Sequence, residues 1–187
     1  MERGYAMARK ESITMEDILS AALEMTREEG IENVTARKLA AKAGCSTQPI
    51  FRIYQNMEEM SKDLFERAAN FFASYYENYP KKDVFAFVDL GMAYIQFAMQ
   101  ERNLFRLLFL SDQRHGKSLY ELLNGKSGAV KQEIARAKAA GCNDPGELFM
   151  KMWICIHGAA CMAITGDYDL NEAETRQLLE ESYRAFV

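Results

Sequence analysis

The chain of 187 residues carries 23 Lys and Arg against 27 Asp and Glu, which gives a net charge of −4. This length supports a buried core in one or two domains, and the composition is that of a soluble globular protein. No apolar run reaches the roughly 18 residues that a membrane span needs. The N-terminal residues include Glu2 and lack the apolar segment and cleavage site of a signal peptide. We therefore expect a cytoplasmic protein with no membrane contact.

The cysteines do not indicate a metal site. Cys45, Cys142, Cys155 and Cys161 form no Cys-x-x-Cys pair, and only two histidines accompany them. In a reducing compartment they are expected to stay free thiols and to act as small buried hydrophobes. We expect no cofactor.

The first part of the chain predicts three helices, over residues 14–30, 35–44 and 46–54. Thr14 caps the first helix, with Asp17 as its capping-box acid. A hydroxyl side chain precedes each of the other two, and a glycine ends each of the first two.

A longer fourth helix begins at Asn56, with Glu59 as its capping partner, and runs to about residue 79, before Pro80. Another helix is marked by Val84, Phe87, Val88, Gly91, Ile95 and Ala98. Further helices are expected over residues 104–108, 118–123, 129–140, 145–165 and 171–186, with a loop over 111–118. No hairpin or period-2 signal is present, so we expect an all-α fold with a head over residues 1–57 and a helical bundle over 58–187.

The helical hairpin over residues 35–54 contains no Asp or Glu, but it holds Arg37, Lys38, Lys42 and Arg52. A basic helix-turn-helix in an acidic chain points to DNA phosphates. Residues 1–56 are balanced, with eight basic and eight acidic residues, so residues 57–187 carry the whole net charge of −4. Only the docking face must be positive, so the acidic total does not exclude DNA binding.

The helix over 46–54 offers the side chains for base recognition. Thr47 and Gln48 lie in its first turn, which usually reaches base edges in the major groove. Gln can make two hydrogen bonds to adenine, and Thr can make a hydrogen bond to a base or touch a thymine methyl group. Pro49 offers only apolar contact. Arg37 and Lys38 are placed for phosphate, as is the helix start at Thr35. The predicted DNA-contacting residues are Thr35, Arg37, Lys38, Ser46, Thr47, Gln48, Pro49, Phe51, Arg52 and Tyr54.

Other interpretations of this segment remain open. A helical hairpin with a Gly turn also occurs in proteins that never bind DNA, and basic side chains are often only solvated surface. Ile50 and Tyr54 are four residues apart and can pack onto the first two helices. Phe51 fits a core position as well as a DNA contact. Arg9 and Lys10 fit either a minor-groove arm or a frayed charged terminus.

Residues 13–64 resemble the DNA-binding domain of TetR/AcrR-type transcriptional regulators. The matching residues run without a gap: Ile18-Leu19, Ala21-Ala22, Glu29-Gly30, Val34-Thr35, Arg37, Leu39-Ala40, Ala43-Gly44, Ser46 and the block from Ile50 to Tyr54. The resemblance implies an all-α homodimer with two heads in successive major grooves of a pseudo-palindromic operator. It also implies a body that dimerises through its last two long helices and holds an inducer pocket.

Two positions depart from this family pattern. Phe51 stands where the family usually has a Tyr whose hydroxyl contacts phosphate, and Met57 stands where it usually has a Lys. Both changes remove phosphate contacts, which predicts weaker and less salt-dependent binding.

The run from Trp153 to Cys161 resembles a C-terminal subclass marked by Trp, His and Gly at this spacing. Its small residues allow two helices to approach closely, which suits a four-helix dimer interface. His157 is either a ligand- or pH-sensing group or a hydrogen-bonded core histidine. The predicted interface residues are Gly158, Ala159, Cys161, Met162, Leu178 and Tyr183.

Aromatic and Met side chains are frequent in the body, and helical bundles can hold apolar pockets. Met is pliant and suits a loosely shaped apolar ligand. We expect a small hydrophobic effector to shift the heads away from the operator. Its predicted pocket residues are Met92, Ile95, Phe105, Phe109, Met152, Trp153, Ile156 and His157.

Two other classes of protein compete with this interpretation. An enzyme is disfavoured because the sequence has no Ser/His/Asp set, phosphate-binding Gly loop or paired carboxylate–His cluster. A helical protein–protein interaction module, or a transcriptional activator without a small-molecule ligand, remains the alternative. The sequence favours a homodimeric repressor that binds double-stranded DNA through the helix over 46–54 and is released by an effector.

Overall fold

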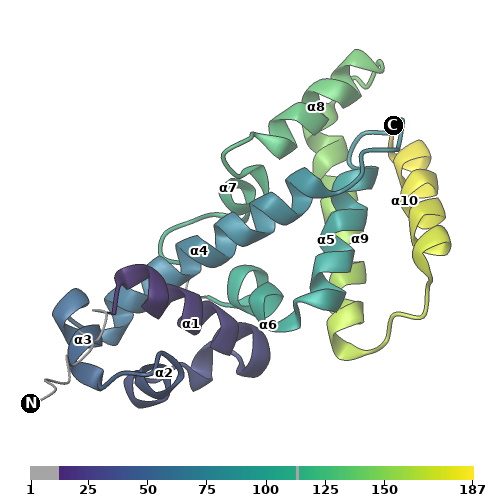
Figure 1. Cartoon of the computed structure of the whole chain (residues 1–187). Coiled ribbons are helices and arrows are strands. Elements are labelled where there is room, and N and C mark those ends of the chain that lie inside the picture. The colour runs from purple at the N-terminus through teal and green to yellow at the C-terminus, as the bar shows by residue number, and fades with distance from the viewer. Residues whose placement is uncertain (1–12, 113) are drawn as a thin grey trace, which may run out of the picture.

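The computed structural model describes residues 13–112 and 114–187, and every regular element in this part of the chain is a helix. A head of three helices lies at one end of α4 (Met57–Asn78), and the remaining helices extend from beside the head to the other end of α4 (Figure 1). The all-α fold with a helical head and a helical body is confirmed. Arg9 and Lys10 lie outside the described residues, so the minor-groove arm stays a prediction.

The head begins as the sequence predicts. Thr14 and Asp17 form a capping box: the Asp17 amide donates to the Thr14 hydroxyl at 3.1 Å and the Thr14 amide to the Asp17 carboxylate at 2.9 Å. Thr35 caps the second helix, while Ser46 precedes the third without a side-chain capping bond. Gly44 takes φ +67° in the turn between these two helices, where a side chain would be strained. The elements are α1 (Met15–Glu29), the 3-10 turn η1 (Ile31–Asn33), α2 (Ala36–Lys42) and α3 (Thr47–Ile53).

The fourth helix, α4 (Met57–Asn78), takes part in two hydrophobic cores. Met60 and Leu64 complete the core of the head, whereas Phe65 and Ala68 belong to the core of the body. The other members of the head core are Ile18, Ala21, Ala22, Met25, Val34, Leu39, Ala40, Ile50 and Tyr54. The division after residue 57 stays a prediction, and α4 serves both parts.

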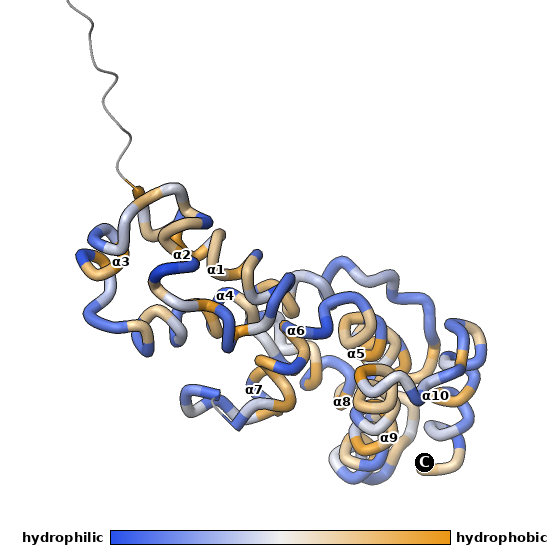
Figure 2. The backbone as a smooth tube through the Cα atoms, turned by 90° about the horizontal axis from the view of Figure 1, so that it is seen from below, coloured by the Kyte–Doolittle hydropathy of each residue, from blue (hydrophilic) through white to orange (hydrophobic). Residues whose placement is uncertain are grey.

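The body is a bundle around two packed helices. The longest helix of the body, α9, packs along α5 and against α8 and α10. The last helix, α10, also packs on α5. In Figure 2 the body helices α8, α9 and α10 gather at the end of the molecule opposite α3. The described residues between Ser111 and Ser118 contain no helix, as expected. The elements are α5 (Val88–Gln100), α6 (Arg102–Phe105), the π-helical turn η2 (Arg106–Leu110), α7 (Leu119–Asn124), α8 (Ala129–Ala139), α9 (Pro145–Thr165) and α10 (Glu172–Phe186).

The predicted start of the fifth helix near Val84 is wrong. Val84 is 83% exposed, and α5 begins only at Val88. Phe87 takes φ +67°, a left-handed conformation that an α-helix does not contain. The Phe87 amide donates instead to the buried Glu133 carboxylate at 2.7 Å, which delays the start of the helix.

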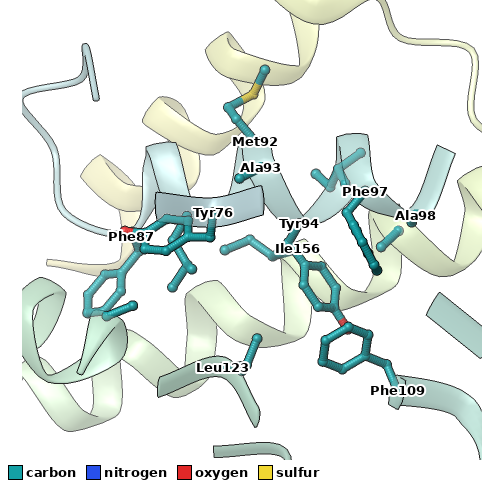
Figure 3. Close-up of a cluster of buried hydrophobic side chains, with 14 of the residues drawn as sticks. Tyr76, Phe87, Met92, Ala93, Tyr94, Phe97, Ala98, Phe109, Leu123 and Ile156 are labelled. Atoms are coloured by element: carbon teal, nitrogen blue, oxygen red, sulfur yellow. The ribbon is translucent and has the colours of Figure 1, made fainter. Parts of the chain in front are cut away.

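Aromatic side chains fill the space between α4, α5 and α9 (Figure 3). The Tyr94 ring centroid lies 6.0 Å from that of Phe72, 5.0 Å from that of Phe105 and 4.8 Å from that of Phe109. The Tyr94 hydroxyl oxygen lies 2.9 Å from Nδ1 of His157. Burial raises the pKa of Tyr94 and lowers the pKa of His157, so the neutral imidazole is favoured. His157 is thus half-buried and hydrogen-bonded within this cluster, and its predicted ligand- or pH-sensing role stays a prediction.

By length and composition alone, α9 is the one helix of the described chain that would fit a membrane span. It packs against α5, α8 and α10, and its first turns carry an ion pair between Glu147 and Lys151 at 2.8 Å. The core helix of a folded bundle has the same length and composition, so this property is weak support for a membrane location.

Gly91 allows three helices of the body to meet. A Cβ atom at this position would lie 2.8 Å from both Ile156 Cγ1 and Leu179 Cδ1. We expect Gly91→Val to lower the free energy of unfolding by about 1–3 kcal/mol, because overpacking a buried site displaces its neighbours. Chemical denaturation measures the change. Gly146→Ala, in the first turn of α9, is the control, because its Cβ would meet nothing closer than 3.4 Å. Equal stability of the two variants would contradict this account of the packing.

Candidate nucleic-acid interface

The helix α3 presents its first turn at the tip of the head, far from α10 (Figures 1 and 2). Thr47 and Gln48 are exposed there. The residues that surround one shallow hollow open to solvent on this surface are Ser46, Thr47, Gln48, Pro49, Phe51 and Arg52. The structure thus brings six of the ten predicted DNA-contacting residues together on one face.

Helical spacing explains why this face points outward. Ile50 is 0% exposed and Tyr54 2% exposed, so this i,i+4 pair anchors α3 in the head. Tyr54 was also predicted as a DNA contact, but its side chain lies in the core and is not part of the exposed face. Burial, with a smaller contribution from the nearby Asp63 carboxylate, raises the pKa of Tyr54 to about 12.

Phe51 lies on the outer face of α3 and not in the core. Its side chain is 50% exposed, which decides between the two positions that the sequence left open. Pro49 is half-buried and lines the same hollow. The candidate interface therefore combines polar and apolar groups.

Two of the four basic side chains in the hairpin are already paired with α1. The ammonium group of Lys38 lies 3.0 Å from the Glu29 carboxylate. The ammonium group of Lys42 lies 2.8 Å from Glu28 and 3.6 Å from Glu24. The hydrogen bond that Lys42 donates to the Glu28 carboxylate raises the pKa of Lys42. Sequence reasoning missed these pairs because the acidic partners lie outside residues 35–54. Spacing gives the only signal: Glu24 and Glu28 share a helical face, as do Lys38 and Lys42.

Arg37 and Arg52 are the basic side chains of the hairpin that remain available. Both are exposed, and neither has an acidic partner among residues 13–112 and 114–187. Thr35 accepts a hydrogen bond from the Lys38 amide at 3.3 Å, which fixes the start of α2 beside Arg37. The hairpin therefore has fewer unpaired positive charges available to bind DNA than its composition indicates.

The eight predicted effector residues do not line one cavity. Met92 and Ile95 border a hollow of about 230 Å³ beside the start of α10. In Figure 3, Met92 points away from α5 on the side opposite Tyr94. The other six residues pack in the core between the helices: Phe105, Phe109, Met152, Trp153, Ile156 and His157. In this structure aromatic rings fill the space between these six residues, so the single pocket stays a prediction.

A larger hollow of about 510 Å³ lies between α4, α5 and α10. Sequence reasoning missed it, although Phe71, Tyr75 and Tyr79 recur every four residues along α4 and share a face. Gln96 and Arg176 line its other walls. Its size falls within the range of small-molecule sites, roughly 300–1,000 Å³.

Four of the six predicted dimer residues line one open hollow along α9 and α10: Gly158, Ala159, Met162 and Leu178. Met162 is 48% and Leu178 39% exposed, and Ile154 beside them is 64% exposed. Tyr183, also predicted here, does not line this hollow: it is buried, with its ring centroid 5.1 Å from that of Phe85. Cys161 is half-buried, with its sulfur 3.6 Å from Nε2 of His157.

Two family models match the chain. The model of bacterial regulatory proteins of the tetR family covers residues 18–64, and that of the tetracyclin repressor-like C-terminal domain covers residues 87–186. A comparison with curated proteins finds no match.

Solved structures share the fold at low sequence identity. A TetR-family protein from Vibrio parahaemolyticus is 20% identical with a TM-score of 0.66, over 91% of this chain and 96% of that chain. A TetR-like regulator from Rhodococcus sp. RHA1 is 13% identical with a TM-score of 0.65, over 95% and 97%. A TetR regulator from Haloarcula marismortui is 16% identical with a TM-score of 0.63, over 92% and 97%. With family models that match both its head and its body, the chain belongs to the TetR family of DNA-binding transcriptional regulators.

Proposed function

We propose that this protein is a homodimeric repressor that binds a pseudo-palindromic operator through α3 and leaves it when a small hydrophobic effector binds the body. The observation that carries the proposal is the exposed first turn of α3, with Thr47 and Gln48 facing solvent while Ile50 anchors the helix. A dimer would place two such turns in successive major grooves, about one helical turn apart. Regulators of this family generally act in the cytoplasm and are generally not enzymes.

The interface residues divide into base-reading and phosphate-binding groups. Thr47 and Gln48 reach base edges, and Gln48 is suited to adenine. Arg37 and Arg52 are the exposed cations without acidic partners in the described chain, so we assign them to phosphates. The paired Lys38 is expected to contribute less, since its interaction with Glu29 must first be exchanged.

Operator selection from a random DNA library, followed by binding titrations, tests these roles. Gln48→Ala should lose about 1–3 kcal/mol of discrimination at one base pair of each half-site. Arg37→Ala should weaken binding to all sequences alike and lower the salt slope by about 1 per head. Circular dichroism checks that both variants keep the wild-type fold. If the selection yields no preferred sequence, the operator proposal fails.

The exposed apolar strip along α9 and α10 supports the proposed dimer. Ile154, Met162 and Leu178 are exposed, and Gly158 beside them leaves open space, because a Cβ there would meet nothing within 4 Å. Two copies of this strip can pack as a four-helix interface. We also place the body in the Trp, His and Gly subclass, supported by the stacking of Trp153 on His157 at 5.3 Å.

Leu178→Glu should convert the dimer to monomers and weaken operator binding by at least roughly tenfold, because a carboxylate buried without a partner costs several kcal/mol. Sedimentation velocity and binding titrations measure the two effects. Ala139→Glu on the exposed surface of α8 is the matched control and should change neither. A Leu178→Glu protein that stays dimeric would place the interface elsewhere.

A direct contact between head and body supports the proposed response to an effector. At the end of α1, Arg27 Nε donates to the Glu101 carboxylate at 2.8 Å, and the guanidinium lies 5.2 Å from the Phe71 ring centroid. Asn103 donates to the Arg27 carbonyl at 2.9 Å. Because Phe71 also lines the larger hollow, a ligand there would touch a side chain that supports Arg27.

Titration of a panel of lipophilic compounds against the operator complex tests this response. At least one compound should bind the wild-type protein by calorimetry and lower its operator affinity. Glu101→Gln should keep that binding but reduce the loss of operator affinity several-fold, because it weakens the contact that transmits the change. Glu180→Gln, which alters an ion pair with Arg184 on α10, is the control. A panel that gives neither heat nor a change in operator affinity would argue against an effector.

A further inference from the structure

The recognition face of α3 contains an exposed aromatic ring. Among residues 13–64, Met15 and Phe51 are the large hydrophobic side chains that are exposed, at 44% and 50%. Phe51 and Pro49 line the hollow that Thr47 and Gln48 also line. At a face proposed to bind DNA, covering an exposed aromatic ring with an apolar group of the partner would be favourable.

Helical spacing arranges this face in two rows. Thr47 and Phe51 are four residues apart and form one row, and Gln48 and Arg52 form the other. The second row can donate hydrogen bonds to bases and phosphates. The first row ends in a benzene ring that can neither donate nor accept a conventional hydrogen bond, and it begins with a Thr that carries a methyl group. The two rows therefore suit different groups on the DNA.

Phosphate attraction contributes less here than the composition of the hairpin indicates. Lys38 and Lys42 are paired with carboxylates of α1, which leaves Arg37 and Arg52 as the cations of the hairpin without acidic partners in the described chain. With few phosphate contacts, the counterion-release contribution is small, and specific binding depends more on the base edges. Among the groups that base pairs present in the major groove, the apolar one is the C5-methyl of thymine.

We infer that Phe51 and Pro49 bind thymine methyl groups, so that each operator half-site carries a thymine that is selected by apolar contact. This inference rests on the proposed operator binding and specifies the group on the DNA, the thymine methyl, that the α3 surface recognises. The Thr47–Phe51 row reads the methyl group, while the Gln48–Arg52 row makes hydrogen bonds to neighbouring groups.

Substitution of thymine by deoxyuridine in the selected operator tests the inference. This change removes the C5-methyl group and keeps every Watson–Crick and groove hydrogen bond. Each thymine is replaced in turn, and binding is measured with the full-length protein at fixed salt. One or two positions in each half-site should lose affinity by about fourfold per methyl group, the value of one buried methylene.

The variant Phe51→Ala assigns the effect to this ring. It should bind the thymine operator more weakly and show no further loss with uracil at the sensitive position, as a double-mutant cycle requires for a direct contact. Phe51 is on the surface, and circular dichroism confirms that the head of the variant is folded. Met15→Ala, which removes the other exposed apolar side chain of residues 13–64, should keep the wild-type response to uracil.

The outcomes separate this inference from the proposed function. If the wild-type protein prefers one operator but responds to uracil at no position, methyl reading is overturned and the operator proposal stands. If the response persists in folded Phe51→Ala protein, another residue reads the methyl group and the assignment to Phe51 is overturned. If no DNA sequence is preferred, both proposals fail together.

Discussion

Leu64 and Phe65 are neighbours in α4, yet each is fully buried in a different hydrophobic core. One unbroken helix of 22 residues therefore belongs to the head and to the body at once. A helix is stiff over this length, so the head cannot change its direction without a movement of α4 or a bend in it. The contact of Arg27 with Glu101 fixes the head at a second point, between α1 and the start of α6. These two connections limit how a change in the body can reach α3.

Charge is used differently inside the body and on the head. Asp89 is fully buried, accepts hydrogen bonds from the amides of Lys82 and Asp83 at 2.8 Å, and lies 3.1 Å from the Arg176 guanidinium. A buried carboxylate is tolerated only with such partners, so these charges fix the junction of α4, α5 and α10. On the head, the ion pairs of α1 with α2 are exposed and contribute little stability. Their main effect is to reduce the positive charge next to DNA.

Features set by neighbouring residues could be predicted from the sequence, and features set by distant contacts could not. The capping box of Thr14 and Asp17 depends on side chains three residues apart and forms as predicted. Asn56 accepts a hydrogen bond from the Glu59 amide as predicted, but the Glu59 carboxylate accepts from the Gln55 amide, so the capping box is incomplete there. The start of α5 depends on Glu133, which is 46 residues from Phe87 along the chain. Helical spacing shows which side chains share a face, so the outward turn of α3 could be predicted. Spacing does not show whether the space between two faces is filled, and the predicted effector pocket between α5 and α9 is occupied by aromatic rings.

The paired lysines of the head and the contact of Arg27 with Glu101 determine how strong the proposed effector response must be. A ligand shifts an equilibrium only by its differential affinity for two states, and coupling between sites is typically 1–3 kcal/mol. In the proposed function, a head whose lysines are paired with α1 would hold DNA through few ionic contacts, so a modest coupling would be enough to release it. The Arg27 guanidinium donates two hydrogen bonds to the Glu101 carboxylate. The Arg27 side chain is 43% exposed and that of Glu101 12% exposed, so water reaches this pair mainly from the Arg27 side. A contact between head and body that water can reach and a head with few unpaired cations therefore both fit the proposed reversible regulator.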